Sequence, residues 1–240
     1  MPPARLHFEK ILCSLAHKMR YIGQTKEEQM PDLTKLTNAI LNGDAKGAVA
    51  ITQEALAANV DPQELVAKYM IPAMDEVGRR FETGDCFVPE LLISARAMKA
   101  ALGLLRPLLA AKGAEPLGRV VIGTVKGDLH DIGKNLVASM LEGAGFAVAD
   151  LGVDVPPDKF ITEIREKKAQ LVALSALLTT TMPYMKTVIE ELKKAGVREH
   201  VKVMVGGAPV TQRFADEIGA DGYSDNANGA VGLARRLVTA

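Results

Sequence analysis

A histidine between two aspartates is the clearest chemical feature of this chain, in the segment KGDLHDIGKN at residues 126–135. The spacing Asp128-x-His130 lets the carboxylate hold one imidazole nitrogen and leaves the other free for a metal ion or a proton. No second protein ligand is evident nearby, and a single protein ligand makes sense mainly where a macrocycle fills the remaining coordination positions. The spacing therefore leaves several roles open for His130: ligand of a metal in a macrocycle, general base, or structural residue of a helix-capping loop.

Two further loops supply hydroxyls and glycines. Ser175 ends an apolar run, and three threonines follow at residues 179–181. Gly206 and Gly207 end another apolar run, and glycines there let a bulky group approach the backbone. We call the segment at residues 126–135 the histidine loop. We expect it to lie beside these two loops if each of the three follows a strand of the same parallel sheet.

The sequence agrees poorly with two classes of protein that bind nucleotides or carry phosphate. A phosphate-binding loop needs four residues between its glycines and a hydroxyl after the lysine, whereas Gly127 and Gly133 enclose five residues and Asn135 follows Lys134. A response-regulator receiver would share the fold but needs a phosphoacceptor aspartate where Ser175 stands. We therefore set both classes aside.

The second half of the chain predicts the elements that position these loops. Short β-branched, apolar runs at residues 119–125, 147–151, 171–175 and 201–205 are each followed by a helical stretch, and a fifth strand is expected around Tyr223. This alternation is typical of a doubly wound, flavodoxin-like (Rossmann-like) parallel five-stranded sheet. Ligands of such sheets bind beyond the carboxyl ends of the strands.

The first half has helical periodicity. Helices are predicted over residues 32–41 and 44–58, from an N-cap at Asp61 with a kink at Pro72, and over residues 87–110, as in a four-helix bundle. We expect four parts: an N-terminal helical extension (residues 1–30), a helical cap domain (31–112), a linker (113–118) and a ligand-binding α/β domain (119–240).

Composition narrows the possible partners. Lys and Arg total 29, as do Asp and Glu, so no polyanion-binding surface is indicated by bulk charge. The 2 cysteines, Cys13 and Cys86, allow neither a disulfide framework nor a zinc knuckle. No stretch approaches the ~18 apolar residues of a membrane span. We expect a cytoplasmic protein that binds neither nucleic acid nor a membrane.

The motifs together resemble a known family. Asp128-x-His130-x-x-Gly133, Ser175-x-Leu177 and Gly206-Gly207 are similar to the motif set of cobalamin-binding domains of the methionine synthase type. The likeness extends through GTVKGDLHDIGKN and DLGVDVP, and the segment VGRRFETGDCFVPELLISARAMKAA resembles the cap signature of that family. Domain order over residues 31–240 resembles the stand-alone corrinoid proteins of methyltransferase systems.

The resemblance implies a site for cobalamin or a related cobamide. His130 would take the lower axial position of cobalt after the cofactor's own base has left it (base-off/His-on). Asp128 would bind the other imidazole nitrogen, and Thr181 stands where the family's relay has a serine. Phe81 and Val88 would cover the upper face of the corrin, or else belong to the ordinary bundle core. The implied cofactor contacts are Gly127, Leu129, Asp131, Ile132, Gly133, Ser175, Leu177, Thr179, Gly206, Gly207, Tyr223 and Asp225.

The resemblance also implies a methyl carrier that does not turn over alone. It would take a methyl group from a methoxylated aromatic, methylamine, methanol or betaine on a substrate-specific methyltransferase. A methyl-corrinoid:acceptor methyltransferase would pass that group to tetrahydrofolate or a thiol, and a reductive activation protein would serve the cobalt.

Two alternatives come from other classes. The cobalamin-binding subunit of a carbon-skeleton mutase would share the D-x-H-x-x-G motif but not the helical cap. A cobalamin-dependent sensor that represses genes in response to light would carry a tryptophan in its cap signature, and this chain has no tryptophan.

Overall fold

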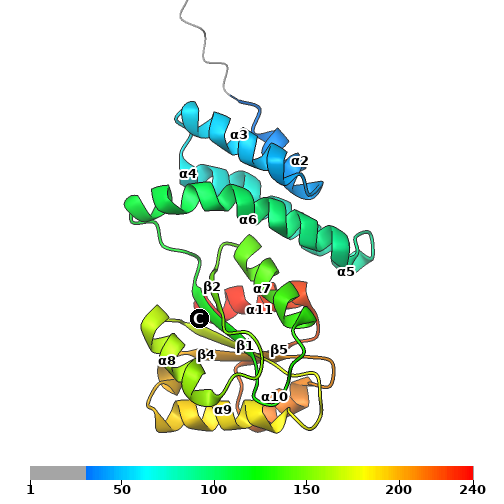
Figure 1. Cartoon of the computed structure of the whole chain (residues 1–240), viewed down its shortest axis with the longest axis vertical. Coiled ribbons are helices and arrows are strands. Elements are labelled where there is room, and N and C mark those ends of the chain that lie inside the picture. The colour runs from blue at the N-terminus through cyan, green and yellow to red at the C-terminus, as the bar shows by residue number, and fades with distance from the viewer. Residues whose placement is uncertain (1–30, 240) are drawn as a thin grey trace, which may run out of the picture. The chain divides into compact units, whose positions relative to one another are not determined.

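The computed structural model describes residues 31–239, so the helical extension expected over residues 1–30 lies outside the described residues. Two regions follow each other along the described chain (Figure 1): a helical region, α2 to α6, and a sheet region that begins with β1. None of the helices within residues 31–239 combines the length and hydrophobicity that crossing a membrane requires.

The sheet has five parallel strands in the order β2-β1-β3-β4-β5, which confirms the predicted doubly wound fold. Its strands are β1 (Arg119–Thr124), β2 (Ala147–Asp150), β3 (Leu171–Ser175), β4 (Lys202–Gly206) and β5 (Gly222–Ser224). The pairing register places Thr124 beside Ser175, Ser175 beside Gly206, and Gly206 beside Ser224. The loops singled out in the sequence therefore leave the sheet side by side.

Helices cover both faces of the sheet, as Figure 1 shows. On one face lie α7 (Ile132–Gly143) and α11 (Ala227–Thr239); on the other lie α8 (Pro157–Lys167), α9 (Pro183–Lys194) and α10 (Gln212–Ile218). Alternate strand residues serve the two cores: Ile122, Ala173 and Met204 pack toward α7 and α11, while Val121, Val172 and Val203 pack toward the other three helices. Burial on both faces explains why the strands are almost continuously apolar.

The helical region contains α2 (Thr34–Leu41), α3 (Ala45–Ala57), α4 (Pro62–Glu64), α5 (Ile71–Thr83) and α6 (Val88–Ala111). A π-helical segment, η1 (Leu65–Met70), joins α4 to α5 without a break and ends just before Pro72. A proline has no N–H and its ring crowds the preceding turn, and a wider π turn accommodates both effects. This π-helical segment lies within two residues of Pro72, where the sequence predicted a kink.

One detail at the start of α4 differs from the prediction. Asp61 occupies the N-cap position, but its side chain caps no helical N–H group. Its carboxylate instead accepts a hydrogen bond from Lys112 Nζ at 2.7 Å. An ion pair to the end of α6 thus replaces the expected cap.

Candidate functional site

A cavity of about 590 Å³ opens at the carboxyl ends of β1, β3 and β4, beside the first turns of α7 and α11. The residues around it are mostly apolar, and the half-exposed ring of His130 lies among them. Most of the predicted contacts line it: Phe81, Leu129, His130, Asp131, Ile132, Gly133, Ser175, Leu177, Gly206, Gly207 and Asp225. A large, mostly apolar cavity with a few convergent polar groups is the usual form of a cofactor site.

The backbone of the histidine loop is fixed by hydrogen bonds. A tight turn follows β1, in which Asp128 N–H donates to the Val125 carbonyl at 3.1 Å and Gly127 has a φ of 82°. Left-handed φ values of this kind favour glycine, which explains Gly127. The Thr124 hydroxyl donates to the His130 carbonyl at 2.9 Å.

Asp128 is completely buried and bonded through both carboxylate oxygens. One oxygen lies 2.8 Å from His130 Nδ1. The other accepts hydrogen bonds from Thr181 Oγ1 at 2.6 Å and from the N–H groups of Leu177 at 2.8 Å and Leu178 at 3.3 Å. Burial opposes the charge, but the donors Thr181, Leu177 and His130 outweigh it and hold the pKa of Asp128 well below its ordinary value.

This arrangement defines what His130 can do. The ionised Asp128 accepts a hydrogen bond, so Nδ1 of a neutral His130 carries the proton. The other nitrogen, Nε2, then presents a lone pair, and the imidazole is 50% exposed. An oriented imidazole with one free nitrogen is suited to bind a single metal position. Within residues 31–239, no group of three or more His, Cys, Asp or Glu side chains is placed to hold a metal ion.

Three glycines line the cavity, and they differ in whether the surrounding protein leaves room for a side chain. A Cβ on Gly133 would meet no atom within 4 Å, so the fold itself does not require glycine there. A Cβ on Gly207 would lie 1.9 Å from the Ala176 carbonyl oxygen, and its φ is 132°. A Cβ on Gly206 would lie 3.1 Å from the Ser224 carbonyl oxygen. The neighbouring backbone thus requires glycine at both positions at the end of β4, Gly206 and Gly207, whereas Gly133 keeps space open in the cavity.

Phe81 reaches the cavity from the end of α5. There Gly84 takes a left-handed conformation, and the N–H groups of Gly84 and Asp85 bond to the carbonyls of Phe81 and Arg80. This pattern ends a helix in a defined geometry. Val88, the other residue expected over the corrin, is half-buried at the start of α6 and is not among the cavity residues.

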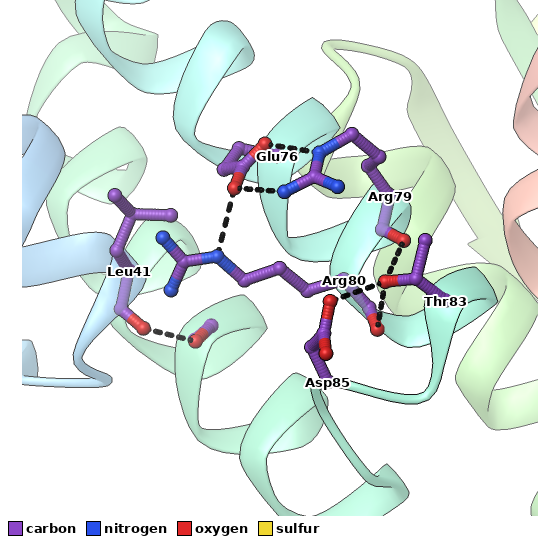
Figure 2. Close-up of polar contacts among 7 residues, drawn as sticks. Leu41, Glu76, Arg79, Arg80, Thr83 and Asp85 are labelled. Atoms are coloured by element: carbon purple, nitrogen blue, oxygen red, sulfur yellow. Dashed lines mark hydrogen bonds and ion pairs between the residues drawn. The ribbon is translucent and has the colours of Figure 1, made fainter.

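Charged and polar side chains near the C-terminal end of α5 bind one another (Figure 2). Glu76 accepts hydrogen bonds from Arg79 at 2.7 and 2.8 Å and from Arg80 at 2.8 Å. Hydrogen bonds from Arg79 and then Arg80 hold the pKa of Glu76 at about 2. The Thr83 hydroxyl binds Asp85 at 2.7 Å. These contacts all lie within the last turns of α5 and just after its end, around Phe81.

The structure places some predicted residues away from the cavity and brings in others. Thr179 is exposed and does not line the cavity, while Tyr223 packs against the core on the opposite face of the sheet. Ser224, Asn226 and Lys134 line the cavity but were not predicted. A signal existed for Lys134, which lies inside the motif string, but not for its burial.

Similarity to known families extends over both regions. Residues 118–232 and residues 33–106 each match a family described as the B12 binding domain. Trimethylamine corrinoid protein 1 of Methanosarcina acetivorans is 47% identical over 208 residues, which cover 86% of this chain and 96% of that protein. Dimethylamine corrinoid protein 1 of the same organism is 45% identical over 207 residues, or 86% of this chain and 97% of that protein.

Two solved structures have the same architecture. A cobalamin-binding protein from Desulfitobacterium hafniense aligns with a TM-score of 0.70 at 34% identity, covering 86% of this chain and 98% of its own. A chain of the methanol:cobalamin methyltransferase complex MtaBC from Methanosarcina barkeri aligns with a TM-score of 0.78 at 30% identity, covering 87% of this chain and 80% of its own.

Proposed function

This chain belongs to the B12-binding corrinoid proteins of methyltransferase systems, and from that premise we propose that it carries methyl groups from a methylamine to a second methyltransferase. The 45–47% identity to dimethylamine and trimethylamine corrinoid proteins supports a methylamine donor, compared with 30% for the chain of the methanol complex. Its cofactor is cobalamin or a related corrinoid, whose cobalt takes up and releases the methyl group when it is bound.

The Asp128–His130 pair at the edge of the cavity is the observation that carries the proposal. His130 Nε2 would hold the lower axial position of cobalt. The space beside Gly133 and the apolar cavity walls fit a large cofactor with a detached tail. The residues present therefore fit a corrinoid bound base-off/His-on.

The protein's own groups would position and shield the cofactor. Asp128 keeps the proton on Nδ1 and directs Nε2 outward, and Thr181 holds Asp128 from the other side. Protonation of this unit is thereby coupled to ligation of the metal. Phe81 would cover the upper face until a partner docks. Substrate specificity would lie in that partner, a methylamine-specific methyltransferase.

The second methyltransferase would pass the group to tetrahydrofolate or a thiol, with a reductive activation protein as a third partner. A mutase subunit or a sensor is not supported by the similar trimethylamine and dimethylamine corrinoid proteins, which match this chain over both of its regions.

The axial role of His130 is tested with the variant His130→Ala. Purified protein labelled with nitrogen-15 histidine and loaded with cobalamin in its cobalt(II) state should show, by electron paramagnetic resonance, the two-line splitting of a histidine nitrogen. The cofactor's own unlabelled base would give three lines instead, and the variant should lose the two-line splitting. Corrinoid affinity should fall roughly tenfold to a hundredfold. The control is His200→Ala, an exposed histidine between α9 and β4. Two-line splitting from a labelled histidine nitrogen that survives in His130→Ala would reject this role.

Methyl transfer is tested by adding the methyltransferase partners of trimethylamine and dimethylamine corrinoid proteins. Loaded wild-type protein should become methylated with one of these amines and not with methanol under the methanol-specific partner. Methylation only in the methanol system would replace the methylamine donor in the proposal.

A further inference from the structure

The loop between β2 and α8 holds the histidine loop in place through Asp154. This loop contains the string DLGVDVP, which resembles the family motif but has no role in the site described above. Resting on the proposed function, we infer that Asp154 is a positioning residue for the cofactor: it clamps the turn that carries Asp128 and thereby fixes the direction of His130.

Asp154 makes two hydrogen bonds to the turn after β1. Its Oδ1 accepts a hydrogen bond from Gly127 N–H at 2.7 Å. Its own N–H donates to the Asp128 carbonyl at 2.9 Å. Asp154 therefore binds the N–H of Gly127 and the carbonyl of Asp128, the two groups that flank the Gly127–Asp128 peptide, across a separation of 27 positions between Gly127 and Asp154.

The backbone of Asp154 is held in an unusual conformation. Three residues other than glycine have positive φ among those that the structure describes: Asn59, Asp154 and Lys168. Asn59 and Lys168 lie within two residues of the ends of the helices α3 and α8, where left-handed residues are common. Asp154, with φ of 52°, ends no helix. Its two bonds to the turn account for a backbone conformation that residues other than glycine rarely adopt.

The clamp acts on the metal-binding side chain through Asp128. The carboxylate of Asp128 has to meet His130 Nδ1 on one side and Thr181 on the other, at 2.8 and 2.6 Å. A small rotation of the Gly127–Asp128 peptide would displace both contacts. The Val125–Asp128 turn bond and the Thr124 bond to the His130 carbonyl would remain. Loss of the clamp should therefore loosen the loop without unfolding it.

Variants of Asp154 separate the clamp from the backbone conformation. Asp154→Gly keeps the left-handed backbone without strain but removes the acceptor, whereas Asp154→Asn keeps an acceptor oxygen and tolerates positive φ. Asp158→Asn is the matched control, because Asp158 is exposed in the first turn of α8 and its carboxylate accepts no hydrogen bond within the described residues. The Thr162 hydroxyl binds only its backbone carbonyl.

The first measurement uses the full-length chain without cofactor. Amide hydrogen exchange at Gly127 should be about tenfold faster in Asp154→Gly than in wild type and should stay within twofold in Asp154→Asn and Asp158→Asn. Equal exchange at Gly127 in all four proteins would overturn the clamp, whatever the cofactor does.

The second measurement uses protein labelled with nitrogen-15 histidine and loaded with cobalamin in its cobalt(II) state, and the splitting scored is the two-line splitting of a histidine nitrogen. Asp154→Gly should bind the corrinoid about tenfold more weakly and show nitrogen splitting in a smaller fraction of molecules, and Asp154→Asn should restore both. Splitting and affinity equal to wild type in Asp154→Gly would overturn the positioning role and leave the function of His130 intact. Absence of splitting in wild type itself would instead reject the proposed axial role, while the Gly127 exchange would still decide whether the clamp exists.

Discussion

At the scale of single residues, the site depends on keeping a buried carboxylate charged. Asp128 has no exposed surface, so each hydrogen bond to it replaces water that it would have had in the unfolded chain. Thr181 supplies the shortest of these bonds, at 2.6 Å, and is itself buried. The hydroxyl of Thr181 is therefore expected to matter more than its methyl group.

We predict that Thr181→Val lowers the free energy of unfolding of the cofactor-free protein by about 1–3 kcal/mol, because the variant leaves a buried charge with one donor fewer. Thr181→Ser keeps the hydroxyl and should cost less than the valine variant. Urea denaturation followed by circular dichroism measures both. A larger loss in the serine variant than in the valine variant would contradict the importance of this hydrogen bond.

The contacts within the site differ in whether the sequence could predict them. The structure brings Asp128, His130 and Thr181 within hydrogen-bond distance. The spacing Asp128-x-His130 suggested the first contact, and Thr181 was implied by the family resemblance. Tyr223 was misplaced because adjacent residues of a strand face opposite sides, so a shift of one position exchanges cavity for core. The contact of Asp154 with Gly127 joins two loops distant in sequence, and no local pattern predicts it.

At the scale of elements, the helix α7 begins within the histidine loop, and its first turn contains Gly133, a glycine that the helix itself does not require.

Helical periodicity and alternating apolar runs predicted the order of strands and helices along the chain, since burial on one or both faces imposes those patterns. The π-helical segment before Pro72 could not be predicted in detail, because several local geometries can accommodate a proline within a helix.

We predict opposite effects of Gly133→Ala on stability and on cofactor binding. Alanine in a helix is favoured over glycine by roughly 0.5–1 kcal/mol, and the added Cβ meets no protein atom within 4 Å. The cofactor-free variant should therefore be more stable to heat, whereas its corrinoid affinity should fall because the methyl group occupies the cavity. Differential scanning calorimetry and equilibrium binding of cobalamin measure the two effects. An alanine variant that gained stability without losing affinity would show that this side of the cavity does not receive the cofactor.

At the scale of the whole molecule, glycines allow the helical region and the sheet region to meet closely. A Cβ on Gly78 of α5 would lie 2.1 Å from Asn228 Oδ1 and 3.1 Å from Met140 Cε, so α5 packs tightly on α11 and α7. Nearby, Asp75 of α5 pairs with Arg235 of α11 at 2.8 Å. Because Phe81 lies on the same helix, we expect the packing of α5 on α7 and α11 to determine how closely Phe81 approaches the cavity.

We predict that Gly78→Val displaces α5 and exposes the bound corrinoid. Overpacking of this kind costs about 1–3 kcal/mol in the free energy of unfolding. In protein loaded with cobalamin, added cyanide should then reach the upper face of cobalt several times faster, as followed by absorption spectroscopy. Gly103→Val is the matched control, because a Cβ there meets nothing within 4 Å and the same loss of helix propensity applies.

A second variant adds Asn228→Ala to Gly78→Val. It removes one of the two side chains that clash with the introduced valine side chain and should bring the rate of the cyanide reaction part of the way back to that of the wild type. If cyanide reacts equally fast with the wild type and with Gly78→Val, the packing of α5 does not control access to the cobalt.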